Sequence, residues 1–280
     1  MYPQRVDLNE QNIAKLINLF KGSYKQIVDE MTTATNFGVA NRKKILSQVE
    51  KILKDLGVDV DKFIKDEIPK YYKTGADQGV KQLQNIGAEI PIKTGFNQVH
   101  KDYIMALVDD TSRAFGESLS GVGRSANLIL GKAFRDGVTQ KIAKGITAGD
   151  ALKEVRNQIV LTLKEQGLSA LKDKAGRSWD LDAYAEMLFR TKVVEARNRG
   201  MVNRMAENGY DLVQVSQHSG TCDICASWQG EVLSITGQTK GYKTVADAEA
   251  DGLFHPNCRH AINTLIPKLA KETEAYDNGN

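Results

Sequence analysis

The sequence lacks the features that mark several large protein classes. No apolar run approaches the roughly 20 residues that span a bilayer, and the N-terminus has no apolar segment of a signal peptide. We therefore expect a protein that is made in the cytoplasm and has no membrane partner. Only three cysteines occur in 280 residues, an odd number that argues against a disulfide framework. The 38 basic and 35 acidic residues nearly balance, so net charge alone does not indicate a polyanionic partner.

Several catalytic signatures are also missing. The chain has no His-Glu-x-x-His of metalloproteases, no Gly-x-x-x-x-Gly-Lys phosphate loop and no His-x-Glu of zinc deaminases. Two enzymatic interpretations remain open. One is a nuclease of the His-Asn-His type, with the segment 255–260 beside a metal and His218 as the general base. The other is a cysteine nucleophile paired with His218 or His260.

Helical periodicity dominates the first part of the chain. Apolar residues recur every three or four positions through most of residues 1–170, which is the pattern of amphipathic helices. Gly57 is expected to end one of these helices. The periodicity fails near 87–97, where we expect an extended connector and a boundary between helical parts. Alternating runs typical of strands come later, at 211–216 and 231–235.

The cysteines and histidines are concentrated in one place. All three cysteines and three of the four histidines lie within a 43-residue window. The window contains a Cys-x-x-Cys pair and, later, a His-x-x-Cys pair, and in each pair two residues lie between the two ligands. Together the two pairs can surround one ion with a tetrahedron of three sulfurs and one nitrogen, a set that Zn²⁺ favours. The predicted ligands are Cys222, Cys225, His255 and Cys258, with His218 and His260 as alternates. A closed set of four protein ligands predicts structural zinc.

These patterns together predict a mainly α fold. It consists of a multi-helix N-terminal body over 1–170 and a small, zinc-stapled α+β module over 171–270. An apolar fraction of 41% is enough for a substantial core. The polar segment 271–280 is expected to be a flexible tail.

A second candidate site is a row of basic residues on the helix predicted over 182–208. Arg190, Arg197 and Arg204 are seven positions apart and therefore share one helix face. Such a row can contact phosphates of DNA or an acidic partner. It is also typical of a solvated face with local ion pairs, for which Glu186 and Glu195 are available.

The final third of the chain carries short motifs at fixed spacing. They are Gly176-Arg-Ser-Trp179, Tyr184-Ala-Glu-Met187, Arg190-Thr191, Val215-Ser-Gln-His218, Trp228-Gln-Gly230, Ser234-Ile-Thr-Gly237 and Asn257-Cys-Arg-His260, with Pro267 behind them. In these motifs the chain resembles the phage minor capsid protein 2 family, which is related to the Mu F-like head morphogenesis proteins. The helical segment 71–76 also resembles the family. One departure is that family members often carry a basic residue and a histidine at positions 222 and 225, whereas Mu F-like relatives more often show the two pairs seen here.

The resemblance implies a phage or prophage structural protein without catalysis. It would act in the virion head, at or near the portal, after assembly in the host cytoplasm. The implied partners are the portal protein and other head proteins, with multiple copies per virion and DNA as a further partner. The alternatives are a metal-dependent nuclease or processing enzyme in the head, and a DNA-binding accessory that uses the arginine row.

Overall fold

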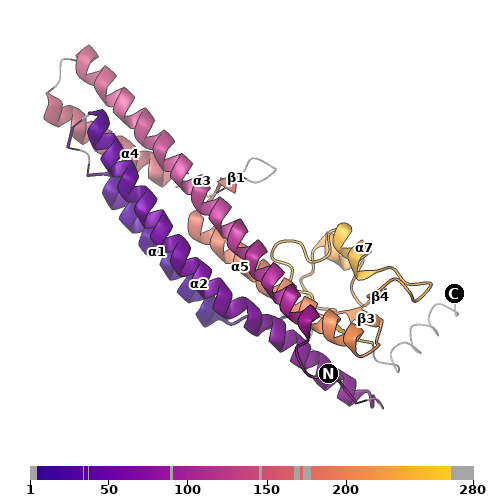
Figure 1. The fold of residues 1–280 in the computed structure, drawn as a ribbon. Helices are drawn as coiled ribbons and strands as arrows, with labels where there is room; N and C mark the ends of the chain where they lie inside the picture. The colour runs from indigo at the N-terminus through magenta and orange to yellow at the C-terminus, as the bar shows by residue number, and fades with distance from the viewer. Residues whose placement is uncertain are drawn as a thin grey trace. The chain divides into compact units, whose positions relative to one another are not determined.

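The computed structural model describes most of the chain (Figure 1). The described residues are 5–33, 35–36, 38–88, 91–144, 147–166, 171–172 and 178–265. The tail predicted over 271–280 lies outside them. The mainly α prediction is confirmed, because long helices account for most of the described residues and one small sheet lies near the C-terminus. No helix in this part of the chain combines the length and the apolar character that a bilayer crossing requires.

The chain forms two compact units, each built from separated segments. The first unit contains residues 1–9, 65–109 and 188–280, and the second contains residues 10–64 and 110–187. Three long helices supply residues to both: α2 (Val39–Asn85), α3 (Gln98–Lys144) and α5 (Leu181–Glu207). The boundary predicted near residue 170 stays a prediction.

The second unit is helical. Its shorter helices are α1 (Glu10–Met31) and α4 (Ala148–Gln166), and a short antiparallel pair, β1 (Leu171–Lys172) and β2 (Ser178–Trp179), also belongs to it. The buried residues of α1 are Ile13, Leu16, Phe20, Ile27 and Met31, and the Phe20 ring lies 5.9 Å from that of Phe115 on α3.

The expected helix end at Gly57 is wrong. Helix α2 continues through this glycine, because the neighbouring turns are held by packing and Leu119 lies 3.4 Å from where its Cβ would be. A connector is present near 87–97 as expected, since α2 ends at Asn85 and α3 begins at Gln98, while the boundary between helical parts expected there stays a prediction.

In the first unit, the backbones of α2 and α5 touch. A Cβ at Gly75 of α2 would overlap the carbonyl oxygen of Arg197, and a Cβ at Gly200 of α5 would overlap the carbonyl oxygen of Tyr72. Only glycine permits such an approach, because it has no side chain to separate the two backbones. The two glycines therefore set the closest point of the helix pair.

A three-stranded antiparallel sheet completes the first unit. The central strand β3 (Leu212–Val215) pairs with β4 (Val232–Ser234) on one side and β5 (Ile262–Thr264) on the other. Apolar side chains of this sheet and its loops form one core with α2 and α5. Its members include Leu83, Met201, Met205, Val213, Val215, Trp228, Leu233 and Ile262.

Buried polar side chains attach β5 to the helix pair. Asn198 of α5 donates to the carbonyl of His260 (3.0 Å) and accepts from the amide of Ile262 (3.1 Å). Gln82 of α2 accepts from the amide of Thr264 (2.6 Å) and donates to the side chain of Asn263 (3.0 Å). The segment that carries the last cysteine and histidine is thus held in register against α2 and α5.

We expect Gly200→Ala to lower the stability of the protein by at least about 2 kcal/mol, because the new methyl group forces two helix backbones apart. Gly75→Ala should have a similar effect. The matched control is Gly22→Ala on α1, where nothing lies within 4 Å of the new Cβ; it should raise stability by up to about 1 kcal/mol through helix propensity. Urea unfolding followed by circular dichroism measures all three. Equal stability of Gly200→Ala and the unchanged protein would contradict the backbone contact.

Candidate metal centre

Two short segments of the first unit bring the cysteines and histidines together. The first follows β3 and forms the short helix α6 (Asp223–Ala226), with Cys222 at its N-cap. The second follows α7 (Val245–Ala250) and leads into β5. Because β3 and β5 are neighbours in the sheet, the loops beside them meet.

The His-Pro-Asn-Cys sequence forms a tight turn. The amide of Cys258 donates to the carbonyl of His255 (2.9 Å), and Asn257 has a φ of 66°. Proline at the second position and a positive φ at the third are the signature of a type II turn. The turn places His255 and Cys258 close to one another and toward the first segment.

The ligand atoms form two overlapping groups. One contains Cys222, Cys225 and His255, the other Cys225, Cys258 and His260, and the atoms of each group lie within 4.8 Å of one another. The Sγ atoms of Cys225 and Cys258 are 3.7 Å apart. Tetrahedral zinc with Zn–S bonds of about 2.3 Å separates its sulfurs by about 3.8 Å. The cluster can therefore hold a metal ion of this size.

Hydrogen bonds orient the His255 ring. Its Nδ1 lies 2.8 Å from the carbonyl oxygen of Pro256, which can only accept, so Nδ1 carries the proton. The lone pair is then on Nε2, which lies 2.9 Å from Sγ of Cys222. A ligand histidine commonly has its second nitrogen held in this way.

The protonation of the thiols suits a cation. Hydrogen bonds to Cys222, first from the backbone of Cys225, lower the pKa of the Cys222 thiol to about 7. Burial, reinforced by the neighbouring thiol of Cys258, raises the pKa of Cys225. A bound cation would offset the effect of burial on Cys225, because a metal ion binds the thiolate form of cysteine and stabilises it.

His260 and His218 lie side by side next to the thiols, and His260 also belongs to the second ligand group. The two rings are tilted by 32°, with centroids 4.2 Å apart. His260 is 2% exposed, and its Nδ1 lies 3.3 Å from Sγ of Cys258. Burial, together with nearby His218, lowers the pKa of His260 to about 4, so its ring is neutral. His218 belongs to neither ligand group among the described residues.

The expectation of an exposed arginine row is wrong for two of its three members. Arg197 and Arg204 are 2% and 0% exposed, and Arg190 is half-buried. The seven-residue spacing does place them on one helix face, but that face is turned into the unit. Neither buried guanidinium is available at the surface for the phosphates of DNA.

Arg197 joins three elements through neutral acceptors. Its Nε and Nη2 donate to Oε1 of Gln78 (2.9 and 2.6 Å), and its Nη1 donates to Asn198 Oδ1 (3.0 Å) and to the carbonyl of Ile262 (2.9 Å). Burial lowers the pKa of Arg197 to about 10. The side chain therefore connects α2, α5 and β5.

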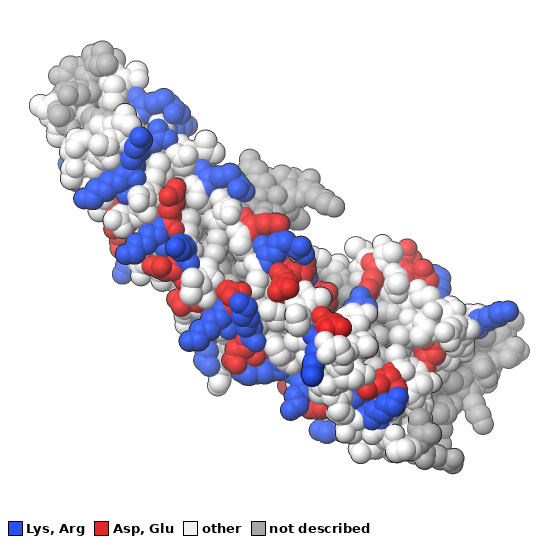
Figure 2. Space-filling view, viewed as in Figure 1, with Lys and Arg blue, Asp and Glu red and all other residues white. Residues whose placement is uncertain are grey.

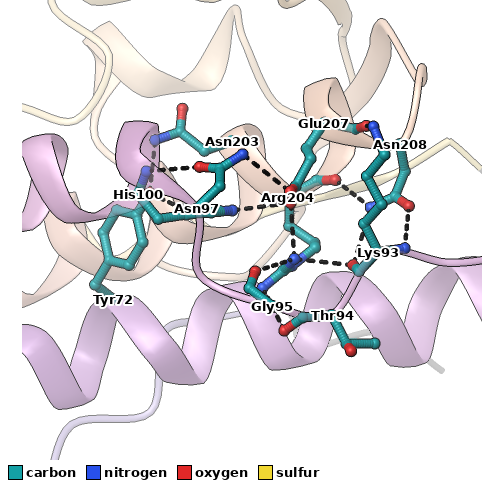
Figure 3. A network of polar contacts seen from close by, with 10 residues as sticks. All are labelled: Tyr72, Lys93, Thr94, Gly95, Asn97, His100, Asn203, Arg204, Glu207 and Asn208. Carbon is teal, nitrogen blue, oxygen red and sulfur yellow. Dashed lines mark hydrogen bonds and ion pairs between the residues drawn. The ribbon is translucent and has the colours of Figure 1, made fainter.

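Arg204 holds the connector between α2 and α3 (Figure 3). Its guanidinium donates to the carbonyls of three successive connector residues, Lys93 (2.8 Å), Thr94 (3.1 Å) and Gly95 (2.9 Å). It also pairs with Glu207 at 2.7 Å. Extended backbone has no helical partners for its carbonyls, so a buried multidentate donor satisfies them.

A chain of hydrogen bonds continues from Glu207 (Figure 3). Its carboxylate lies 3.0 Å from Nε2 of His100, whose Nδ1 lies 2.9 Å from the hydroxyl of Tyr72. Asn203 donates to that hydroxyl at 2.6 Å. The tyrosine then donates to Nδ1, and Nε2–H of His100 donates to Glu207. The sequence interpretation did not include His100, the one histidine outside the cysteine window.

Asp211 organises the loop after β4 and was also missed. Its carboxylate accepts from the hydroxyls of Ser234 (2.6 Å), Thr236 (2.7 Å) and Thr239 (2.5 Å) and from the amide of Thr236 (2.8 Å). Burial opposes ionisation, but these hydrogen bonds outweigh it and hold the pKa of Asp211 well below its ordinary value. In the sequence, the run of serine and threonine residues at the end of β4 and after it was the sign that a nearby carboxylate could accept several hydrogen bonds.

A comparison with protein-family models identifies the chain. The family described as "Phage minor capsid protein 2" matches residues 31–279. The chain therefore belongs to the phage minor capsid protein 2 family, as the sequence motifs suggested. No curated protein and no solved structure matches it.

We expect purified protein to contain about one zinc ion per chain, and Cys225→Ser to remove most of it, because Cys225 is common to both ligand groups. The melting temperature should fall with the metal. His218→Gln is the matched control and should keep the metal. Elemental analysis and thiol titration give the result; a metal-free native preparation with three freely titrating thiols would exclude the site.

We expect Asp211→Asn to lower the melting temperature at neutral pH, because the neutral amide is a weaker acceptor for the three hydroxyls. The folded pKa of Asp211 is depressed, so its stabilising effect is present above the unfolded value and is lost as the pH falls through the folded one. The difference between variant and unchanged protein should therefore shrink below about pH 4. The control is Glu231→Gln, which removes the charge of an exposed carboxylate in the same region and should change the melting temperature little at any pH. A difference that persists undiminished at pH 2 would refute this assignment.

Proposed function

We propose that this member of the phage minor capsid protein 2 family is a structural component of the phage head that docks at the portal during assembly. Membership in the family supports a structural role in the capsid and in contacts with other head proteins. The match over residues 31–279 is the observation that carries the proposal. Assembly in the host cytoplasm and the presence of multiple copies per virion belong to the same proposal.

The buried polar side chains of the first unit bind other parts of the same unit, which supports a role without catalysis. The Glu207–His100–Tyr72 chain has the connectivity of a catalytic triad. Its last member is fully buried, however, and burial raises the pKa of Tyr72 to about 12. A protonated hydroxyl without access to solvent cannot act as a nucleophile. We therefore assign this chain to holding the α2–α3 connector.

For the metal centre, we propose structural zinc held by Cys222, Cys225, His255 and Cys258. His255 presents a free Nε2 lone pair toward Cys222, and the turn from His255 to Cys258 carries the second pair. His260 would support Cys258 from the side, through its Nδ1 at 3.3 Å. If His260 were the ligand instead, His260→Ala would lose metal and His255→Ala would keep it.

A metal-dependent nuclease or processing enzyme is the alternative function. It needs an open coordination position for water or substrate. A set of three thiolates and one imidazole fills all four positions of a tetrahedral zinc ion, which favours the structural assignment. Metal-dependent cleavage of DNA by the purified protein would reverse this preference.

For docking, we propose the exposed apolar side chains on the first turns of α3. Val99 and Tyr103, which are four residues apart and therefore share one face of the helix, are 55% and 43% exposed. Buried apolar and aromatic anchors supply most of the affinity of protein interfaces. The exposed first turns of α3 therefore provide a short apolar surface for the portal or another head protein.

We expect the protein in purified particles, at far fewer copies than the major capsid protein, and we expect purified portal to retain it without DNA. The double change Val99→Ser with Tyr103→Ser should weaken retention at least tenfold, whereas Leu128→Ser, which removes an exposed apolar side chain of the second unit, should not. Quantitative mass spectrometry and a portal pull-down are the measurements. Particles that lack the protein at every stage, with normal heads from a deletion phage, would overturn the proposal.

A further inference from the structure

Two guanidinium groups of the second unit lie beside the same glycine. Arg42 belongs to the first turns of α2, and Gly131 and Arg135 belong to α3. A Cβ at Gly131 would lie 3.0 Å from Nη2 of Arg42 and 3.4 Å from Nη1 of Arg135. The absence of a side chain at this position allows both cations to rest on the same part of α3.

The acceptors around this pair are neutral. Nη2 of Arg42 donates to the side-chain oxygen of Asn127 (2.7 Å), and its buried Nε has no hydrogen-bond partner among the described residues. Within the same part of the chain, no carboxylate lies at ion-pair distance from Arg42 or Arg135. Two like charges held together without an anion repel each other, and an anion bound between them would remove that cost.

Two stretches of sequence that carry these cations contain no acidic residue, and they are bordered by Glu50, Glu117 and Asp136, of which Glu50 lines the same groove as Asn127. Residues 31–49, which include the start of α2, contain no Asp or Glu, and neither do residues 118–135 of α3. The cations of these segments are Arg42, Lys43, Lys44, Arg124, Lys132 and Arg135. Basic side chains gather where α3 ends, with few acidic ones between them on the face that Figure 2 shows. Elsewhere on this face the two signs are mixed.

We infer that these six residues, here called the α2–α3 cation cluster, bind the phosphodiester backbone of nucleic acid. The planar guanidinium fork matches phosphate oxygens, and the flanking lysines add non-directional charge. The cluster contains no aromatic residue for base stacking, so binding should be independent of sequence. An acidic protein would meet the same charges together with the exposed side chain of Leu128, and the polyglutamate arm of the test below separates that outcome from nucleic acid.

This inference rests on the proposed function, because a location in the phage head is what would bring the protein into contact with nucleic acid. It moves the DNA contact from the buried arginines of α5 to the second unit. Binding by purified protein and presence in particles are separate measurements, so either can fail without the other.

The test is fluorescence anisotropy of a labelled 20-base-pair duplex with the full-length protein at several salt concentrations. We expect binding at low salt, a loss of at least about tenfold in affinity for Arg42→Gln with Arg135→Gln, and a salt dependence shallower by about two counterions. Duplexes of different sequence should bind alike. Melting temperatures of the variants establish that folding is retained.

The matched control is Arg113→Gln with Lys70→Gln, which also removes two positive charges. Both side chains are exposed, and each pairs with a carboxylate at 2.6 Å, Arg113 with Asp110 and Lys70 with Asp66. Their loss should change affinity less than about threefold. If Arg42→Gln disturbs folding, Lys43→Gln with Lys44→Gln and Lys132→Gln tests the cluster without touching the packed pair.

Three results would overturn the inference. The first is no binding of duplex by the unchanged protein at low salt. The second is an equal loss of affinity in the control and in the cluster variants, which would indicate only a net-charge effect. The third is tighter binding of a labelled polyglutamate peptide than of DNA, which would assign the cluster to an acidic protein partner.

Discussion

The contact between the backbones of α2 and α5 is the constraint on which the first unit depends. Gly75 of α2 lies against the carbonyl of Arg197, and Gly200 of α5 lies against the carbonyl of Tyr72, so the two helices touch without a side chain between them. With the helices so close, polar side chains near the crossing are shut off from solvent. Arg197, Asn198 and Arg204 are consequently buried and must find partners within the unit. The segment 71–76, which resembles the family in its sequence, contains one of these glycines.

The buried partners determine where the remaining parts of the first unit lie. Arg197 and Asn198 hold β5, and β5 follows directly from the turn that carries Cys258 and His260. Arg204 holds the extended connector at three successive carbonyls. The group of cysteines and histidines is therefore attached to the helix pair through buried hydrogen bonds, and a metal ion bound there would link the two loops that the sheet has already brought together. Metal binding and packing would stabilise the same arrangement.

The two units differ in how their charged side chains are used. In the first unit, buried charges satisfy the backbone of a connector and a strand. In the second, the start of α2 and a long stretch of α3 carry cations without acids, and two of these cations lie together beside Gly131. Two guanidinium groups held together without an anion repel each other, and this repulsion is the reason to expect an anionic ligand.

The sequence by itself determined the helical class, the connector near 87–97, the gathering of cysteines and histidines in one place, and the family. Each of these depends on local spacing: periodicity of apolar residues, paired ligands two residues apart, and motifs within short segments. The direction in which a helix face points does not depend on spacing, so the arginine row could be recognised as a row but not as buried. Likewise, Gly57 carries the signal of a helix end, and only packing against α3 keeps α2 continuous there. The tertiary structure alone brought His100 to Glu207, Asp211 to its hydroxyl donors and Arg42 to Arg135, because each of these pairs joins residues far apart in the chain whose meeting depends on how the elements pack.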